Sequence, residues 1–240
     1  MILCVSFLAV VSGIFSSQTS RFERAPSLHS PSSLIASPNV AALHFEAFGL
    51  HGKLSFEVFE MAYEGYLIHA PSREDRLTIV DFSKPSTEKR MWVLDMKNNK
   101  ILYHAIVSHG RNSGDTYAKK FSNIHGSFQS SLGFYKTAQP YQGSNGYSMV
   151  LEGLEKGIND QAKARAVVMH GADYCSEEFI KRTGRLGRSY GCPALPRAIN
   201  KKVIDDIKLG SILFIYAPDP SYLANSTSIK SLREEKISVL

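Results

Sequence analysis

The sequence predicts a mainly β domain with helices at its edges, an α+β arrangement whose β part is an open sandwich or a barrel. Two patterns lead to this fold class. Upstream of residue 71, apolar positions recur at helical spacing, whereas from Leu77 onward they come in short runs of five to seven residues bounded by turn formers. The 240 residues, 43% of them apolar, suffice for one well-filled domain.

The first 20 residues are apolar and then small and polar, with no charged side chain. The apolar run Ile2 to Phe15 is shorter than the ~20 residues of a membrane span. We expect residues 1–20 to be a signal peptide or an N-terminal anchor, with residues 1–16 as the part that would anchor the protein in a membrane. No basic residue precedes the run, so both readings stay open. Residues 21–39, rich in serine and proline, are expected to form a linker.

Residues 40–70 are expected to form a helical N-terminal segment. Asn39 is a suitable N-cap for a helix that begins at Val40. A second helix is expected from Ser55, because apolar side chains at Phe56, Phe59 and Tyr63 share one helical face.

The stretch 71–217 is expected to be the main, β-rich domain, followed by a C-terminal tail at 218–240. Asparagines 98 and 99 predict a hairpin turn between two of its strands. A helix from Ser176 to Thr183 and another from Pro196 to Leu209 would interrupt the strands. The expected strands are 77–82, 91–96, 101–107, 126–137, 147–152, 165–170 and 211–216.

The chain has a formal net charge of +6. This charge suits an anionic cell wall or membrane surface, although the same charge spread over the surface also serves solubility alone. Basic and aromatic residues are not interleaved as in nucleic-acid-binding motifs, so DNA or RNA is not an expected partner.

One cysteine lies in a glycine-flanked turn, Gly184 to Pro193, and a histidine ends an apolar run upstream. A thiol becomes a nucleophile when a neighbouring base or cation stabilises its thiolate. We expect Cys192 to be that nucleophile and His170 its base. Gly191, directly before the cysteine, leaves the backbone free to direct N–H groups at a developing oxyanion. The pattern therefore predicts acyl transfer through a thioester.

These residues resemble the L,D-transpeptidases, the YkuD-like cysteine enzymes that remodel peptidoglycan, in particular the murein L,D-transpeptidase catalytic-domain branch. The resemblance covers roughly residues 40 to 217. It is carried by ordered stretches at 108–114, 130–135, 170–174 and 184–189, and by the Ser-x-Gly-Cys motif that ends at Cys192. One departure is Tyr190, where better-known members have a histidine.

The resemblance implies a substrate, a product and a place. Cys192 would attack the carbonyl that precedes the terminal D-alanine of a peptidoglycan tetrapeptide stem and release D-alanine. The acyl group would pass to an amine, which forms a 3→3 cross-link, or to water, which makes the enzyme an L,D-carboxypeptidase. The protein would be exported to the periplasm or cell envelope. No metal or organic cofactor is implied, and the oligomeric state is left open.

The resemblance also implies further site residues. Backbone groups at Ser189, Tyr190 and Gly191 would form the oxyanion hole, and the Gly171 carbonyl would orient the imidazole. Candidate substrate contacts are Arg185, Arg188, Asp173 and Tyr174, since guanidinium groups suit carboxylates. An arginine that binds loop carbonyls is an equally good reading of the first two.

Three alternatives remain open from the residues alone. The chain is consistent with a different cysteine peptidase or amidase, and with a wall-binding module that has no catalytic activity. Cys175 and Cys192 could pair as a disulfide in an oxidising compartment. A zinc site at His170 and these two cysteines lacks the paired short spacings of structural zinc sites.

Overall fold

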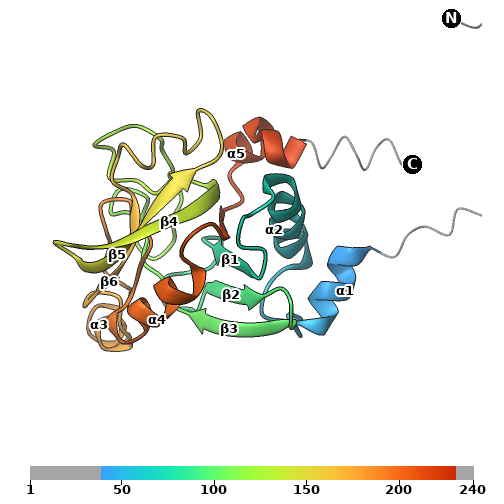
Figure 1. Cartoon of the computed structure of the whole chain (residues 1–240). Coiled ribbons are helices and arrows are strands. Elements are labelled where there is room, and N and C mark those ends of the chain that lie inside the picture. The colour runs from blue at the N-terminus through green and yellow to red at the C-terminus, as the bar shows by residue number, and fades with distance from the viewer. Residues whose placement is uncertain (1–38, 231–240) are drawn as a thin grey trace, which may run out of the picture. The chain divides into compact units, whose positions relative to one another are not determined.

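The computed structural model describes residues 39–230, so the predicted signal or anchor and nearly all of the predicted linker lie outside the described residues. This part of the chain forms a succession of helices and strands, most of which are labelled in Figure 1. They are α1 (Val40–Ala47), α2 (Phe56–His69), β1 (Arg76–Asp81), β2 (Met91–Asp95), β3 (Lys100–Ala105), β4 (Gly133–Gly143), β5 (Gly146–Gly153), β6 (Val168–Ala172), α3 (Glu177–Thr183), β7 (Ala194–Pro196), α4 (Arg197–Ile207), β8 (Ile212–Tyr216) and α5 (Pro220–Asn225).

All eight strands join one mixed sheet in the order β3-β2-β1-β8-β4-β5-β6-β7. The sheet nearly closes on itself, because Ser108, three residues after β3, forms an isolated bridge with Ala194 in β7 at the opposite edge. This near-barrel with helices around it confirms the predicted mainly β fold class. None of the helices within residues 39–230 is long and apolar enough to cross a membrane.

The two N-terminal helices lie where the sequence predicts helices. The Asn39 side chain caps α1 by accepting the Ala42 N–H at 3.2 Å. Helix α2 packs against β1 and β8 (Figure 1). Its Gly65 permits a close approach to the sheet, because a Cβ there would lie 2.0 Å from the Phe134 ring. The N-terminal helices are therefore part of the same hydrophobic core as the sheet.

The later helices also form where expected. Ser176 caps α3 by accepting the Phe179 N–H at 3.2 Å. The expected hairpin turn between β2 and β3 has Asn99 at a positive φ of 51°. Helix α4 packs against β5, β6 and β7 (Figure 1), beside the strands that carry the candidate site.

The predicted strand at 126–137 is wrong in its first half, because β4 begins only at Gly133. The chain turns at Phe128, whose φ is +55°, and the carbonyls around it bind side chains in place of a neighbouring strand. The strand predicted at 165–170 likewise begins late, at Val168, since Ala166 has a φ of +54°. The short β7 and helix α5 were not predicted.

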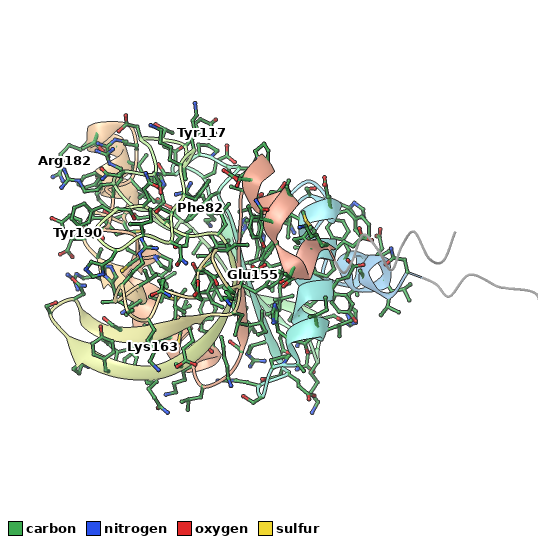
Figure 2. All side chains as sticks on the ribbon, turned by 90° about the horizontal axis from the view of Figure 1, so that it is seen from above. Phe82, Tyr117, Glu155, Lys163, Arg182 and Tyr190 are labelled. Carbon is green, nitrogen blue, oxygen red and sulfur yellow. The ribbon has the colours of Figure 1, made fainter. Side chains whose placement is uncertain are left out.

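Residues 218–230, within the predicted C-terminal tail, pack on the domain. Tyr222 is buried, and its hydroxyl donates to the Glu155 carboxylate at 3.2 Å. Ser226 donates to the same carboxylate. Figure 2 shows Glu155 beside the short helix α5.

Candidate active site

The nucleophile turn lies directly before β7. Gly191 has a φ of +127°, a conformation that residues with a Cβ rarely adopt. A Cβ at this position would also lie 2.9 Å from the Gln129 carbonyl oxygen. Glycine is therefore required here both by the backbone conformation and by the loop packed against it.

Ser189 holds the turn closed. Its hydroxyl donates to the Cys192 carbonyl at 2.6 Å and accepts the Gly191 N–H at 3.0 Å. Its own N–H donates to the His109 carbonyl at 2.9 Å. Ser189 is therefore a structural anchor of the turn.

Strand pairing places the two principal candidates together. In the parallel pair of β6 and β7, His170 lies opposite Ala194, so Cys192 lies near Val168. Consistent with this register, the Val168 N–H donates to the Cys192 thiol at 3.4 Å. Side chains two residues apart on a strand share a face. Val168 and His170 therefore share a face of β6, and the register places Cys192 two residues from the position opposite His170.

The thiol of Cys192 contacts backbone groups. It accepts from Val168 and lies 3.7 Å from the Ala166 carbonyl, to which it donates. In the described structure, no hydrogen bond joins it to His170. Burial raises the pKa of the Cys192 thiol, while the Val168 N–H and the charge of Arg165 lower it in part. The resting group is a neutral thiol.

His170 is buried, and its Nδ1 lies 3.1 Å from the Gly171 carbonyl oxygen. That carbonyl can only accept, so Nδ1 carries the proton and Nε2 has its lone pair available as a base. Burial lowers the pKa of His170, and the nearby Arg197 charge lowers it further. The imidazole is therefore neutral near neutral pH.

The backbone N–H groups of the turn differ in availability. Those of Ser189 and Gly191 are engaged by His109 and by the Ser189 hydroxyl, respectively. Within the described residues, the N–H groups of Tyr190 and Cys192 have no such partner. They are the donors of the turn that remain available to an oxyanion.

Both cysteines are free thiols in the structure. Cys175 is buried in a small apolar cluster with Ile106, Leu186 and Ala194. Burial raises the pKa of the Cys175 thiol to about 11. Across residues 39–230, no group of three or more histidine, cysteine, aspartate or glutamate residues is placed to hold a metal ion.

The predicted substrate contacts are engaged within the chain. Arg188 lies 2.6 Å from Asp115 and donates to the Gly114 carbonyl at 3.1 Å. Arg185 donates to the Leu186 carbonyl at 2.8 Å. These contacts match the loop-binding reading of the two arginines, and recognition of a substrate carboxylate stays a prediction.

The other two predicted contacts, Asp173 and Tyr174, follow directly after the last residue of β6. Asp173 forms an exposed ion pair with Arg197 at 2.6 Å. The Tyr174 ring packs against Gly187, where a Cβ would lie 2.3 Å from the Tyr174 Cβ. Burial raises the pKa of the Tyr174 hydroxyl.

Arg165 is a site residue that the sequence analysis missed. Its guanidinium donates to the Ser122 carbonyl at 2.6 Å and to the Gln129 carbonyl at 2.7 Å. Gln129 also lies against Gly191, so Arg165 connects the loop at 122–131 to the nucleophile turn. The only signal for it in the sequence is a charged residue at the start of an apolar run.

A buried pair supports the loop at 108–114. The fully buried Arg90 donates to Nδ1 of His109 at 2.8 Å, so Nδ1 accepts and Nε2 donates to the Gly114 carbonyl. Burial and the Arg90 charge lower the pKa of His109 to about 4. This histidine stays neutral at physiological pH and serves to fix the loop that binds Ser189.

Three solved structures are similar to the chain at low sequence identity. They are an L,D-transpeptidase from Mycobacterium smegmatis (13% identity, TM-score 0.37, covering 60% of this chain and 59% of that one), an Enterococcus faecium L,D-transpeptidase with a cysteine-to-serine mutation (16%, 0.37, 60% and 50%) and the helical cell shape determining protein Pgp2 from Campylobacter jejuni (15%, 0.38, 62% and 50%). The chain thus spans between half and three-fifths of the length of these structures. No curated protein matches it.

A family model gives the assignment. The model of the L,D-transpeptidase catalytic domain matches residues 50–216, which include β1 to β8, the nucleophile turn and His170. The match extends over more than half of the chain and over the whole near-barrel. The chain therefore belongs to the L,D-transpeptidase catalytic-domain family.

Proposed function

We propose that the protein is a cysteine L,D-transpeptidase that acts on the tetrapeptide stems of peptidoglycan, exported to the cell envelope. The observation that carries the proposal is the parallel pairing of β6 with β7, in which His170 lies opposite Ala194, two residues after Cys192, while the Gly171 carbonyl orients the imidazole. Thioester chemistry needs such a nucleophile and base.

In the first half-reaction, Sγ of Cys192 attacks the carbonyl of the third stem residue while Nε2 of His170 takes the thiol proton. The N–H groups of Tyr190 and Cys192 stabilise the oxyanion. The bond to D-alanine breaks, His170 donates the proton to the leaving amine, and a thioester remains on Cys192.

In the second half-reaction, an amine attacks the thioester. His170 takes a proton from that amine, the C–S bond breaks, and the proton returns to the Cys192 sulfur. An amine from another stem yields the 3→3 cross-link, and water in its place yields the shortened stem. The Gly171 carbonyl keeps the imidazole in the tautomer that both steps need.

The test incubates the reduced full-length protein with purified disaccharide-tetrapeptide and follows the products by mass spectrometry. We expect wild-type protein and Cys175→Ala to release D-alanine, and Cys192→Ala to release none above background. Cys175 is a matched control because it is also a thiol near the site, but buried with a pKa of about 11. Dimers indicate transpeptidation, and tripeptides indicate hydrolysis.

Three results would overturn the proposal. Release of D-alanine by Cys192→Ala would remove the cysteine from the chemistry. No turnover by the wild type, combined with binding to sacculi that survives Cys192→Ala, would favour the binding module. Cleavage of ordinary L,L peptides would favour a different cysteine peptidase.

A further inference from the structure

Two exposed aromatic rings stand beside the nucleophile turn. The Tyr190 side chain is 67% exposed and that of Phe128 is 41% exposed, and their ring centroids lie 4.9 Å apart. Tyr190 is two residues before Cys192, and Figure 2 shows it at the periphery of the domain. The catalytic chemistry proposed above uses neither ring.

Phe128 is held in place at a conformational cost. Its φ of +55° is rare for an aromatic residue. Neighbouring groups hold the backbone around it: the Asn112 N–H donates to the Phe128 carbonyl, and Arg165 binds Ser127 and Gln129 on either side. A rigid backbone thus presents a ring that gains little from burial.

A cation completes the surface. The Arg111 guanidinium lies 5.8 Å from the centroid of the Tyr190 ring. No ion pair of the Arg111 side chain is found within the described residues, so its N–H groups are available to a carbonyl or an anion. We name Phe128, Tyr190 and Arg111 the aromatic platform.

Resting on the proposed function, we propose that the aromatic platform binds a sugar ring of the glycan strand that carries the stem peptide. The stem itself consists of small or charged residues, which offer no broad apolar face. A hexose offers a face of C–H bonds that packs on an aromatic ring, and its N-acetyl carbonyl suits a guanidinium.

The distances agree with this assignment. Three residues separate the sugar from the scissile bond, an extended length of ~10 Å. One residue, Gly191, separates Tyr190 from Cys192, so their Cα atoms lie at most ~7 Å apart, and the ring adds to that reach. A stem bound at Cys192 is therefore long enough for its sugar to reach the platform.

The experiment compares kcat/KM for disaccharide-tetrapeptide and for the free tetrapeptide of the same sequence. We expect the wild type to prefer the disaccharide form by about tenfold. Phe128→Asn should bring the two substrates within about twofold of each other, because asparagine accepts a positive φ but provides no ring. Its activity on the free tetrapeptide should stay at the wild-type level.

Two further variants serve as controls. Phe128→Tyr keeps a ring and should keep the preference. Phe179→Ala removes another ring with an arginine near its face, the Arg182 guanidinium at 5.3 Å on α3, and should also leave the preference unchanged. Equal kcat/KM values for the two substrates in the wild type would overturn the proposal, as would a preference that survives Phe128→Asn.

A binding measurement separates this proposal from the proposed function. Disaccharide-dipeptide, which lacks the scissile bond, is titrated into wild-type protein, Phe128→Asn and Cys192→Ala by calorimetry. Binding that is weakened about tenfold by Phe128→Asn and unaffected by Cys192→Ala supports the platform even if no turnover occurs. Equal affinities for wild-type protein and Phe128→Asn would overturn it.

Discussion

His170 and Cys192 are both neutral in their resting state. Burial destabilises the charged form of each group, which raises the pKa of the thiol and lowers that of the imidazole. These directions favour transfer of the thiol proton during attack over a standing thiolate–imidazolium pair. They also protect the thiol from oxidation and alkylation, since the thiolate is the reactive form.

The acidic limb of the pH profile follows from the pKa of His170. The imidazole must be neutral to act as a base, so kcat/KM for D-alanine release should fall only below the ordinary histidine pKa of 6.5. Arg197→Gln removes a nearby positive charge, which raises the pKa of His170 and moves the limb to higher pH. The side chain is half exposed, so we expect a shift of less than about one pH unit.

Pre-steady-state release of D-alanine between pH 4 and pH 8 provides the profile. Lys202→Gln is the matched control, because it removes a positive charge from the same helix and Lys202 does not contribute to the pKa shift of His170. An acidic limb that stays in place in Arg197→Gln would contradict the effect of the Arg197 charge on the pKa of His170.

The loop at 122–131 and the start of β6 form one rigid unit around the thiol. Arg165 connects them through the carbonyls of Ser122 and Gln129, and its charge lowers the pKa of Cys192. Ala166, the next residue, has a positive φ, and its carbonyl accepts a hydrogen bond from the thiol. The residues directly before β6 therefore determine the surroundings of the Cys192 thiol.

Arg165→Ala should raise the pKa of the Cys192 thiol and slow its alkylation by iodoacetamide. It also leaves the part-buried Gln129 carbonyl without its donor, at a cost of about 1–3 kcal/mol in the free energy of unfolding. Arg165→Lys keeps the charge but not the planar fork, so it should recover much of the alkylation rate and only part of the stability. Rates are read from intact mass as a function of pH, with Cys192→Ala reporting the contribution of Cys175.

The result that contradicts this account is specific. If Arg165→Ala alkylates at the wild-type rate at every pH while its stability falls, Arg165 acts on the loop alone and not on the thiol.

At the scale of the whole domain, Glu155 ties the C-terminal residues to the sheet. Its buried carboxylate accepts the Phe134 N–H at 2.9 Å in β4 and the hydroxyls of Tyr222 and Ser226. Burial raises the pKa of Glu155 more than these hydrogen bonds lower it. The last described residues are thus part of the fold that supports β4 and β8.

The sign of the pH dependence follows from that raised pKa. Between the ordinary value of 4.5 and the raised value in the fold, the folded protein binds the proton more tightly than the unfolded chain does. The contribution of Glu155 to stability is therefore fully present below pH 4.5 and is lost as the pH rises through the folded pKa. Glu155→Gln should remove the loss of stability with rising pH. It should also lower the free energy of unfolding below pH 4.5 by about 1–3 kcal/mol, because the glutamine NH₂ would face groups that donate hydrogen bonds to the carboxylate.

Denaturant unfolding of the wild type and of Glu155→Gln from pH 4 to pH 8 measures the difference. Glu152→Gln serves as the control, because Glu152 lies in β5 and its carboxylate forms a solvent-exposed ion pair with Lys163. The same slope of unfolding free energy against pH in the wild type and in Glu155→Gln would show that Glu155 does not titrate in this range.

Much of the fold could be predicted from local pattern. The caps at Asn39 and Ser176, the turn at Asn99 and most strands of the near-barrel were predicted because capping, left-handed turns and apolar runs depend on neighbours in sequence. The strand predicted at 126–137 failed for the opposite reason. The residues next to Phe128 are polar, and the carbonyls of this stretch bind Arg165 and Asn112 from distant parts of the chain.

The sequence alone determined the family and the identities of the candidate nucleophile and base, since Gly191-Cys192 and His170-Gly171 form ordered motifs. Only the tertiary structure decided which N–H groups remain available, that Arg165 influences the thiol, and that the two cysteines are separate. Those properties depend on side chains and carbonyls that meet across the sheet from segments far apart in the chain. Hydrogen bonding and burial depend on which atoms lie close together in space, and the order of residues along the chain does not give this information.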